Sequence, residues 1–137
     1  MAFELIDRKY VNRATEREPM LSFSKSMVTQ RKEKVACYKI YFNVAAKLLF
    51  THDRVRPYYD AETNRLGLEP CSVKDGNSIG VYKPSNRGGW IAANTIARVI
   101  GEEPFGKSYP CYQCNEGGYE LIVVDLNCPI KKENGTT

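Results

Sequence analysis

One order of predicted elements occurs twice along this chain, and that repetition constrains the fold more than any single motif. In each half a strand leads into an asparagine, a short helix, a second strand, a tight turn and a third strand, over residues 35–70 and 90–126. An offset of 51 residues aligns the two helices without gaps and matches Asn43 with Asn94. One unit is too small to bury its own sheet face, whereas two units packed about a pseudo-two-fold axis can share one core. Three of the sixteen aligned positions are identical, so chance similarity is the alternative explanation.

The element boundaries follow from apolar alternation and from residues that start or stop helices. The predicted strands are 20–28, 35–42, 54–59, 65–69, 79–83, 90–93, 107–114 and 119–126. The predicted helices, 44–49 and 95–100, follow Asn43 and Asn94 as N-caps, and Gly101 is the predicted stop of the second helix. We therefore predict an α+β fold class in which the two strand–helix–hairpin units form a small antiparallel β-barrel.

The composition fits one globular domain. Of the 137 residues, 42% are hydrophobic and 26% are charged, which is enough apolar material for a core. We place the domain at residues 20–128, between an N-terminal arm (1–19) and a flexible tail (129–137). No run of 18 apolar residues is present and the first ten residues carry charges, so we expect a cytoplasmic protein with no membrane partner. This composition excludes a disulfide-rich secreted scaffold, a coiled coil and a large multidomain enzyme.

No motif of the chain predicts catalysis or a cofactor. Cys111 and Cys114 form a CxxC pair without a second pair, and on an extended strand these positions face opposite sides. We interpret them as structural thiols, with zinc or redox use as the alternative. His52, the one histidine, is predicted to lie on the surface, and the paired glycines mark turns rather than phosphate loops. We predict that the protein is not an enzyme and binds no metal or cofactor.

Part of the sequence resembles the AbrB/MazE-type swapped-hairpin β-barrel family. The resemblance rests on YKIYFNVAAKLL (38–49), RVRPYYD (54–60) and NRLGLEP (64–70) and covers residues 35–70, more faintly 90–126. It implies a barrel that two chains normally build, and here the second unit can replace the second chain.

That family binds DNA, as regulators or antitoxins, through basic residues on the strand–helix face. The matching positions are Lys39, Lys47 and, in the second unit, Arg98. The chain departs from the pattern where Asn43 replaces a proline and Phe50 a glycine, and where one lysine replaces an arginine pair. The chain also has the general look of small phage or prophage proteins.

Basic and aromatic residues are the candidates for partner binding. The net charge of +4 permits nucleic-acid binding without requiring it. A charged tip over 30–34 joins the first two strands, and its charges have solvation as their plain alternative explanation. The complete set of predicted nucleic-acid or partner contacts is Lys25, Arg31, Lys32, Lys34, Lys39, Lys47, Arg54, Arg56 and Arg98. The tyrosines that can stack on bases or anchor a protein, or half-bury on the sheet instead, are Tyr38, Tyr41, Tyr58, Tyr59, Tyr109 and Tyr112.

Three classes of function fit these observations. The leading hypothesis is a non-enzymatic DNA-binding regulator of the AbrB-like type. The alternative is a phage-encoded protein inhibitor that binds a host nucleic-acid-processing protein, such as a defence nuclease (anti-CRISPR type), in the bacterial cytosol. A small phage structural protein is the third. A homodimer is left open, and the sequence names neither the partner nor a preferred DNA site.

Overall fold

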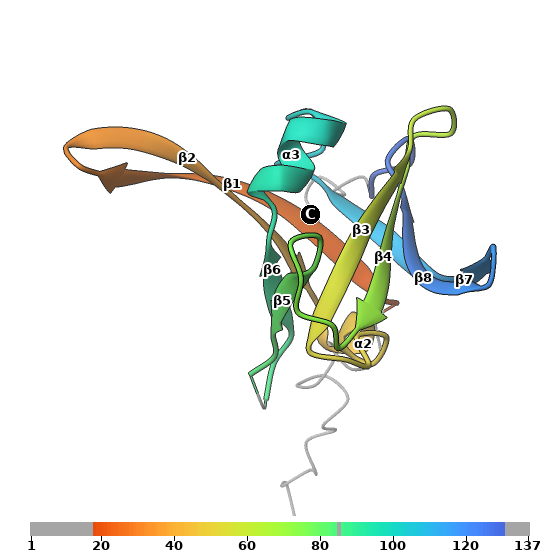
Figure 1. Cartoon of the computed structure of the whole chain (residues 1–137). Coiled ribbons are helices and arrows are strands. Elements are labelled where there is room, and N and C mark those ends of the chain that lie inside the picture. Colours follow the sequence, from red (N-terminus) through yellow and green to blue (C-terminus); the bar gives the residue numbers. More distant parts are fainter. Residues whose placement is uncertain (1–17, 85, 131–137) are drawn as a thin grey trace, which may run out of the picture.

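Eight antiparallel strands close into a barrel within a single chain. The computed structural model describes residues 18–84 and 86–130, so most of the predicted N-terminal arm (1–19) and tail (129–137) lies outside the described residues. The strands are β1 (Met20–Gln30), β2 (Glu33–Phe42), β3 (Arg54–Asp60), β4 (Arg65–Cys71), β5 (Ile79–Tyr82), β6 (Gly89–Ala92), β7 (Ser108–Glu116) and β8 (Tyr119–Asp125). Their order around the barrel is β1-β2-β6-β5-β3-β4-β8-β7 (Figure 1).

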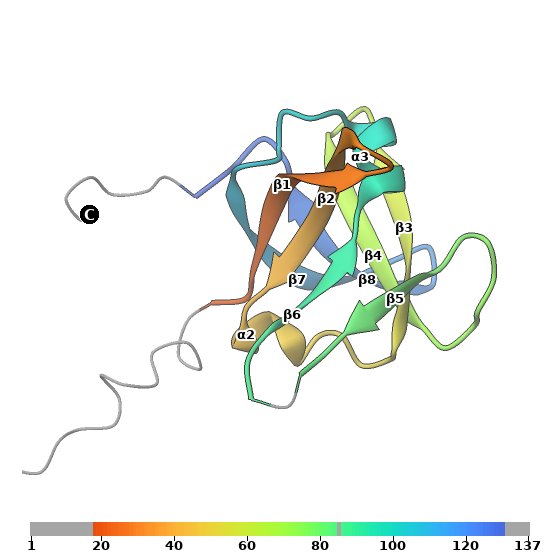
Figure 2. The same cartoon turned by 90° about the vertical axis from the view of Figure 1, so that its left-hand side faces the viewer.

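Two short helices lie at opposite ends of the barrel, α2 (Val44–Lys47) at one end and α3 (Asn94–Ile100) at the other (Figures 1 and 2). The antiparallel barrel is confirmed. The α+β class is wrong, because the helices contribute only 4 and 7 residues and the fold is mostly β. Among the described residues, no helix has the length and apolar character needed to cross a membrane.

The core fills the barrel interior because each strand turns every second side chain inward. Opposite pairs such as Leu21 with Phe42 and Phe23 with Ile40 are almost fully buried. Phe50, just beyond α2, stacks on Phe42 with ring centroids 4.1 Å apart and helps to cover that end of the barrel.

The two asparagines at the strand–helix junctions behave differently. Asn43 is the N-cap of α2, as predicted, and its side-chain oxygen accepts a hydrogen bond of 2.9 Å from the Ala46 amide. The prediction for Asn94 is wrong: α3 begins at Asn94 itself, after Ala93, without a side-chain cap. The Asn94 oxygen instead accepts from the Tyr38 amide at 2.8 Å, just beyond the residues of β2 that pair with β6.

Both helices end close to the predicted positions. Gly101 ends α3 with a φ of +88°, which confirms it as the stop and explains why glycine is suited there. The first helix is shorter than expected, since α2 ends at Lys47 and the chain continues in a turn.

Two hairpins are longer than predicted, and both extend beyond the barrel. The predicted charged tip over 30–34 is shorter than expected, because the β1–β2 ladder continues to Gln30 opposite Glu33 and only two residues form the turn. The β7–β8 ladder likewise continues to Glu116 opposite Tyr119. A run of charged residues indicates solvent exposure, and an exposed two-stranded ribbon provides that exposure as well as a loop does.

We call residues 24–37 the β1–β2 arm and residues 112–121 the β7–β8 arm. β1 pairs with β7 only at residues 20–22, and β2 pairs with β6 only at residues 39–42, so within residues 18–84 and 86–130 neither edge of the β1–β2 arm has a third strand. The two arms extend on opposite sides of the barrel (Figure 1). They also differ in charge: the β1–β2 arm carries four basic residues and one acidic residue, whereas the β7–β8 arm carries two acidic residues and no basic one.

Candidate nucleic-acid interface

The tip of the β1–β2 arm is a two-residue turn formed by Arg31 and Lys32. Their φ angles of +50° and +67° place both in the left-handed region, as a tight type I′ hairpin requires. Both are exposed, as is Lys34 on the returning strand. Within the described part of the chain, none of the three forms an ion pair or a side-chain hydrogen bond. These three charges are therefore available to an anionic partner.

The base of the same arm is fixed to the barrel by a carboxylate that sequence reasoning missed. Glu102, just after α3, accepts from Lys25 Nζ at 2.5 Å and from the Tyr38 hydroxyl at 2.7 Å. The hydrogen bond from Lys25, followed by that from Tyr38, lowers the pKa of Glu102, and Glu102 in turn raises the pKa of Lys25. The ion pair between Lys25 and Glu102 therefore fixes the base of the arm to the segment just after α3.

Lys39 and Lys47, the two residues matched to the DNA-binding family in the first unit, contact other parts of this chain. The Lys39 ammonium lies over the Trp90 ring, 4.2 Å from its centroid. Lys47 Nζ donates to the Pro84 carbonyl oxygen, and also to that of Arg87 at 3.0 Å. Lys47 thus holds the segment between β5 and β6 against the end of α2.

Arg98 is exposed on α3, at the end of the barrel opposite the helix of Lys47 (Figure 1). Because α2 and α3 lie at opposite ends of the barrel, Lys47 and Arg98 are far apart in the fold. The strand–helix face that the resemblance implies, with Lys39, Lys47 and Arg98 together, is therefore not assembled.

Arg54 and Arg56 do lie on one face of β3, as predicted, but both contact the loop over 72–78. Arg54 Nε donates to the Ser78 hydroxyl at 2.7 Å, and Arg56 Nη2 lies 2.6 Å from an Asp75 carboxylate oxygen. The hydrogen bond from Arg56 is the main cause that lowers the pKa of Asp75. These arginines order a loop, and half of their charge is already neutralised.

The tyrosines separate in a similar way. Tyr109 is buried in the core, and the hydroxyls of Tyr58 and Tyr59 donate to Glu69 and Asn64 at 2.9 and 2.6 Å. Tyr41 is 42% exposed on the outward face of β2. Sequence reasoning missed Tyr82 and Trp90, two aromatic residues on the same outward face. Their neighbours Val81 and Ile91 point inward, and successive residues of a strand point to opposite faces.

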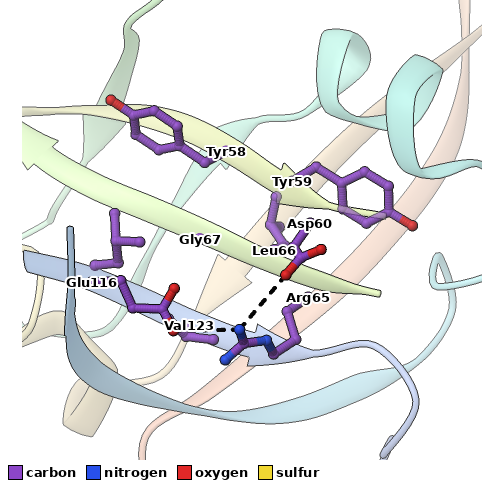
Figure 3. Close-up of a pocket in the computed structure, with 9 residues that line it drawn as sticks. Tyr58, Tyr59, Asp60, Arg65, Leu66, Gly67, Glu116 and Val123 are labelled. Carbon is purple, nitrogen blue, oxygen red and sulfur yellow. Dashed lines mark hydrogen bonds and ion pairs between the residues drawn. The ribbon is translucent and has the colours of Figure 1, made fainter. Parts of the chain in front are cut away.

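The pocket beside the β3–β4 turn is poorly suited to an anion. It has a volume of about 130 Å³, and Arg65 lies between Asp60 and Glu116, with N···O distances of 3.7 and 3.3 Å (Figure 3). Two carboxylates therefore surround the single basic side chain of this pocket.

The cysteines and the histidine occupy the positions expected from their strands and loops. Cys111 is buried, and burial raises the pKa of its thiol to about 12. Cys114 is half-buried further along β7, and no group of three or more His, Cys, Asp and Glu side chains able to hold a metal occurs in 18–84 and 86–130. His52 is exposed and lies 3.0 Å from the Thr51 hydroxyl.

In comparisons with known proteins, no family model, no curated protein and no solved structure matches the chain.

Proposed function

We propose that this protein is a non-enzymatic DNA-binding regulator whose β1–β2 arm contacts duplex DNA. The observation that carries the proposal is the exposed basic tip formed by Arg31, Lys32 and Lys34. Lysine and arginine that neutralise phosphates supply most of the non-specific affinity of DNA-binding proteins.

The shape of the arm fits the same partner. The major groove of B-DNA is about 12 Å wide and admits a two-stranded β-ribbon. Six residues of β1, Lys25–Gln30, give the arm a reach of about 20 Å at roughly 3.3 Å per residue. This is enough for the tip to enter a groove while the barrel stays outside the phosphate backbone.

The barrel is proposed to be of the AbrB-like swapped-hairpin type, closed within one chain. The units in this proposal are residues 20–71 and 79–125, each with two hairpins separated by a helix. Every pairing has its counterpart: β2 pairs with β6 and β4 with β8, while β1 pairs with β7 and β5 with β3. Each hairpin therefore pairs with strands of the other unit, and the pattern of pairings has the symmetry of a pseudo-two-fold axis.

One strand pair supports this duplication in detail. Ile40 in β2 pairs directly with Ile91 in β6, and the two are separated by the same 51 residues that align the halves of the sequence. A residue and its equivalent face each other only where a two-fold axis passes between them.

The test is fluorescence anisotropy of a labelled mixed-sequence duplex across a salt series. We expect micromolar binding that weakens steeply with salt, and a loss of affinity in the double variant R31Q/K32Q. The control K74Q removes an exposed charge on the loop over 72–78 and should bind like the unmodified protein. Equal weakening by both variants would overturn the assignment of the arm, and no binding at low salt would overturn the function.

A second candidate, an inhibitor that binds a host nucleic-acid-processing protein, is favoured by the β7–β8 arm. That arm combines Glu116 and Glu120 with Tyr112 and Tyr119, which are 46% and 51% exposed. An acidic, tyrosine-rich surface suits a protein site that normally receives nucleic acid. Inhibition of a purified CRISPR nuclease that is lost in E116Q/E120Q and retained in R31Q/K32Q would favour this candidate over the regulator.

A further inference from the structure

Three aromatic side chains form a row on the outer face of the barrel. Trp90 in β6 pairs directly with Tyr41 in β2 on one side and with Tyr82 in β5 on the other. Residues directly opposite each other on antiparallel strands share a face, so all three rings point outward. The rings of Tyr82 and Trp90 are 5.5 Å apart, and Tyr82 is 50% exposed. We call this row the aromatic platform.

The platform borders a cavity that is partly enclosed by the connection between β5 and β6. The cavity has a volume of about 340 Å³ and is lined by the three aromatic residues together with Arg87, Gly88 and other residues of the β5–β6 connection. Gly88 permits the close approach of this connection, because a Cβ there would overlap the Phe42 carbonyl group. The two hydrogen bonds from Lys47 hold the same connection in place.

The charge around the platform is positive. No residue that lines the cavity is acidic, and Arg87 is exposed without an ion pair among the described residues. Lys39 adds a second cation, whose ammonium lies over the Trp90 ring. A cationic ligand such as a methylated lysine is disfavoured here, because Lys39 already occupies the ring face and would repel it.

We propose that the aromatic platform binds single-stranded nucleic acid, with unpaired bases stacked on Tyr41, Trp90 and Tyr82 and with phosphates held by Lys39 and Arg87. Flat rings beside cations match the two parts of a nucleotide. Stacking of a base on an aromatic ring is stronger than an exposed cation–π contact, so a base can displace the Lys39 ammonium from Trp90. The displaced ammonium then stays within reach of the adjacent phosphate.

The platform lies on the same side of the barrel as the β1–β2 arm, because strand β2 runs through both (Figure 2). The two surfaces nevertheless act on different parts of a nucleic acid. The arm needs only phosphates and a groove, whereas the platform needs exposed base faces. The inference therefore stands without the proposed duplex binding.

The test uses the intrinsic fluorescence of Trp90, the one tryptophan of the chain. Oligo(dT) and oligo(U) are titrated against the protein, with an abasic oligomer of the same length as the phosphate-only probe. We expect oligo(dT) or oligo(U) to quench the fluorescence and the abasic oligomer to leave it unchanged. Quenching by both oligo(dT) and oligo(U) indicates that the platform does not distinguish the two sugars, whereas quenching by one of them identifies DNA or RNA as the ligand. No quenching by either strand, or equal binding of the abasic oligomer, would overturn the proposal.

Variants separate stacking from folding. Y82A should weaken single-strand binding by about 5- to 150-fold, the effect of losing one base–aromatic contact. Y82F should restore the binding, and Y119A, which removes a tyrosine of equal exposure on the β7–β8 arm, should leave it unchanged. Y82A should also keep duplex binding, and R31Q/K32Q should keep the quenching, so failure of one proposal is distinguishable from failure of the other. Unchanged single-strand affinity in Y82A would refute the platform.

Discussion

Replacing Arg31-Lys32 by Asn-Gly should stabilise the protein and weaken its binding to DNA at the same time. Both residues have positive φ angles, +50° and +67°, in a two-residue hairpin turn. Asn-Gly is the preferred sequence for such a turn, since asparagine tolerates the left-handed region and glycine adopts it without steric cost. The natural residues therefore keep their charge at the expense of turn stability.

The size of the effect follows from the backbone. An L-residue in the left-handed region costs roughly 1–2 kcal/mol. The extra freedom of glycine in the unfolded chain offsets about 0.5–1 kcal/mol of the strain that the substitution removes. We expect R31N/K32G to raise the free energy of unfolding by about 1 kcal/mol, which corresponds to a rise in Tm of roughly 3–4 °C for a domain of this size. Urea unfolding followed by Trp90 fluorescence measures the change.

The same variant removes two phosphate contacts. Each contact contributes about 0.9 to the slope of log K against log salt concentration, so the slope should fall by about 1.8. Anisotropy titrations with a duplex at several salt concentrations measure it. A variant that is more stable but binds as before would refute the role of the tip in binding, and a variant that is less stable would refute the account of the turn.

Three further predictions concern the barrel and its ionisable groups. G88A should lower the free energy of unfolding, measured in urea, by about 2 kcal/mol or more, because the new Cβ would overlap backbone atoms of β2. G76A, with open space around it, should unfold like the parent. Lys25 lowers the pKa of Glu102 from its usual 4.5. The contribution of ionised Glu102 to stability is therefore present above pH 4.5 and is lost as the pH falls through the lowered pKa. The urea midpoint of E102Q should accordingly change less between pH 6 and pH 3 than that of the parent. Cys111, buried and with a pKa of about 12, should resist iodoacetamide at pH 8 until the protein unfolds, and mass spectrometry of the native protein that finds it alkylated would contradict its placement.

The local parts of the fold could be predicted because their signals lie within a few residues. Alternation around Leu21 and Phe23 gives β1, and Asn43 gives the start of α2. The closed strand order could not be predicted in the same way, since pairs such as Leu21 with Tyr109 join residues far apart in the sequence. The role of Asn94 was missed for the same reason, because its partner is the amide of a distant strand.

The candidate site shows a similar division. Residue type identifies the basic side chains, but only the fold decides which of them are already paired. Lys25 contacts Glu102 and Lys47 contacts the Pro84 carbonyl across more than 30 positions of sequence. Arg31 and Lys32 form the turn of the arm, and in the part of the chain that the structure describes they have no ion-pair partner. Charge at a hairpin turn was therefore a better guide to an available cation than charge on a strand or helix.

The claim that the β1–β2 arm contacts DNA is tested most directly by mapping the contact residue by residue. Amide chemical shifts of the isotope-labelled protein are recorded by NMR with and without a mixed-sequence duplex at low salt. The account predicts that the largest changes fall on residues 29–35 and that residues 115–120, at the tip of the β7–β8 arm, stay unchanged. Changes confined to the β7–β8 arm, or none at a saturating duplex concentration, would contradict it.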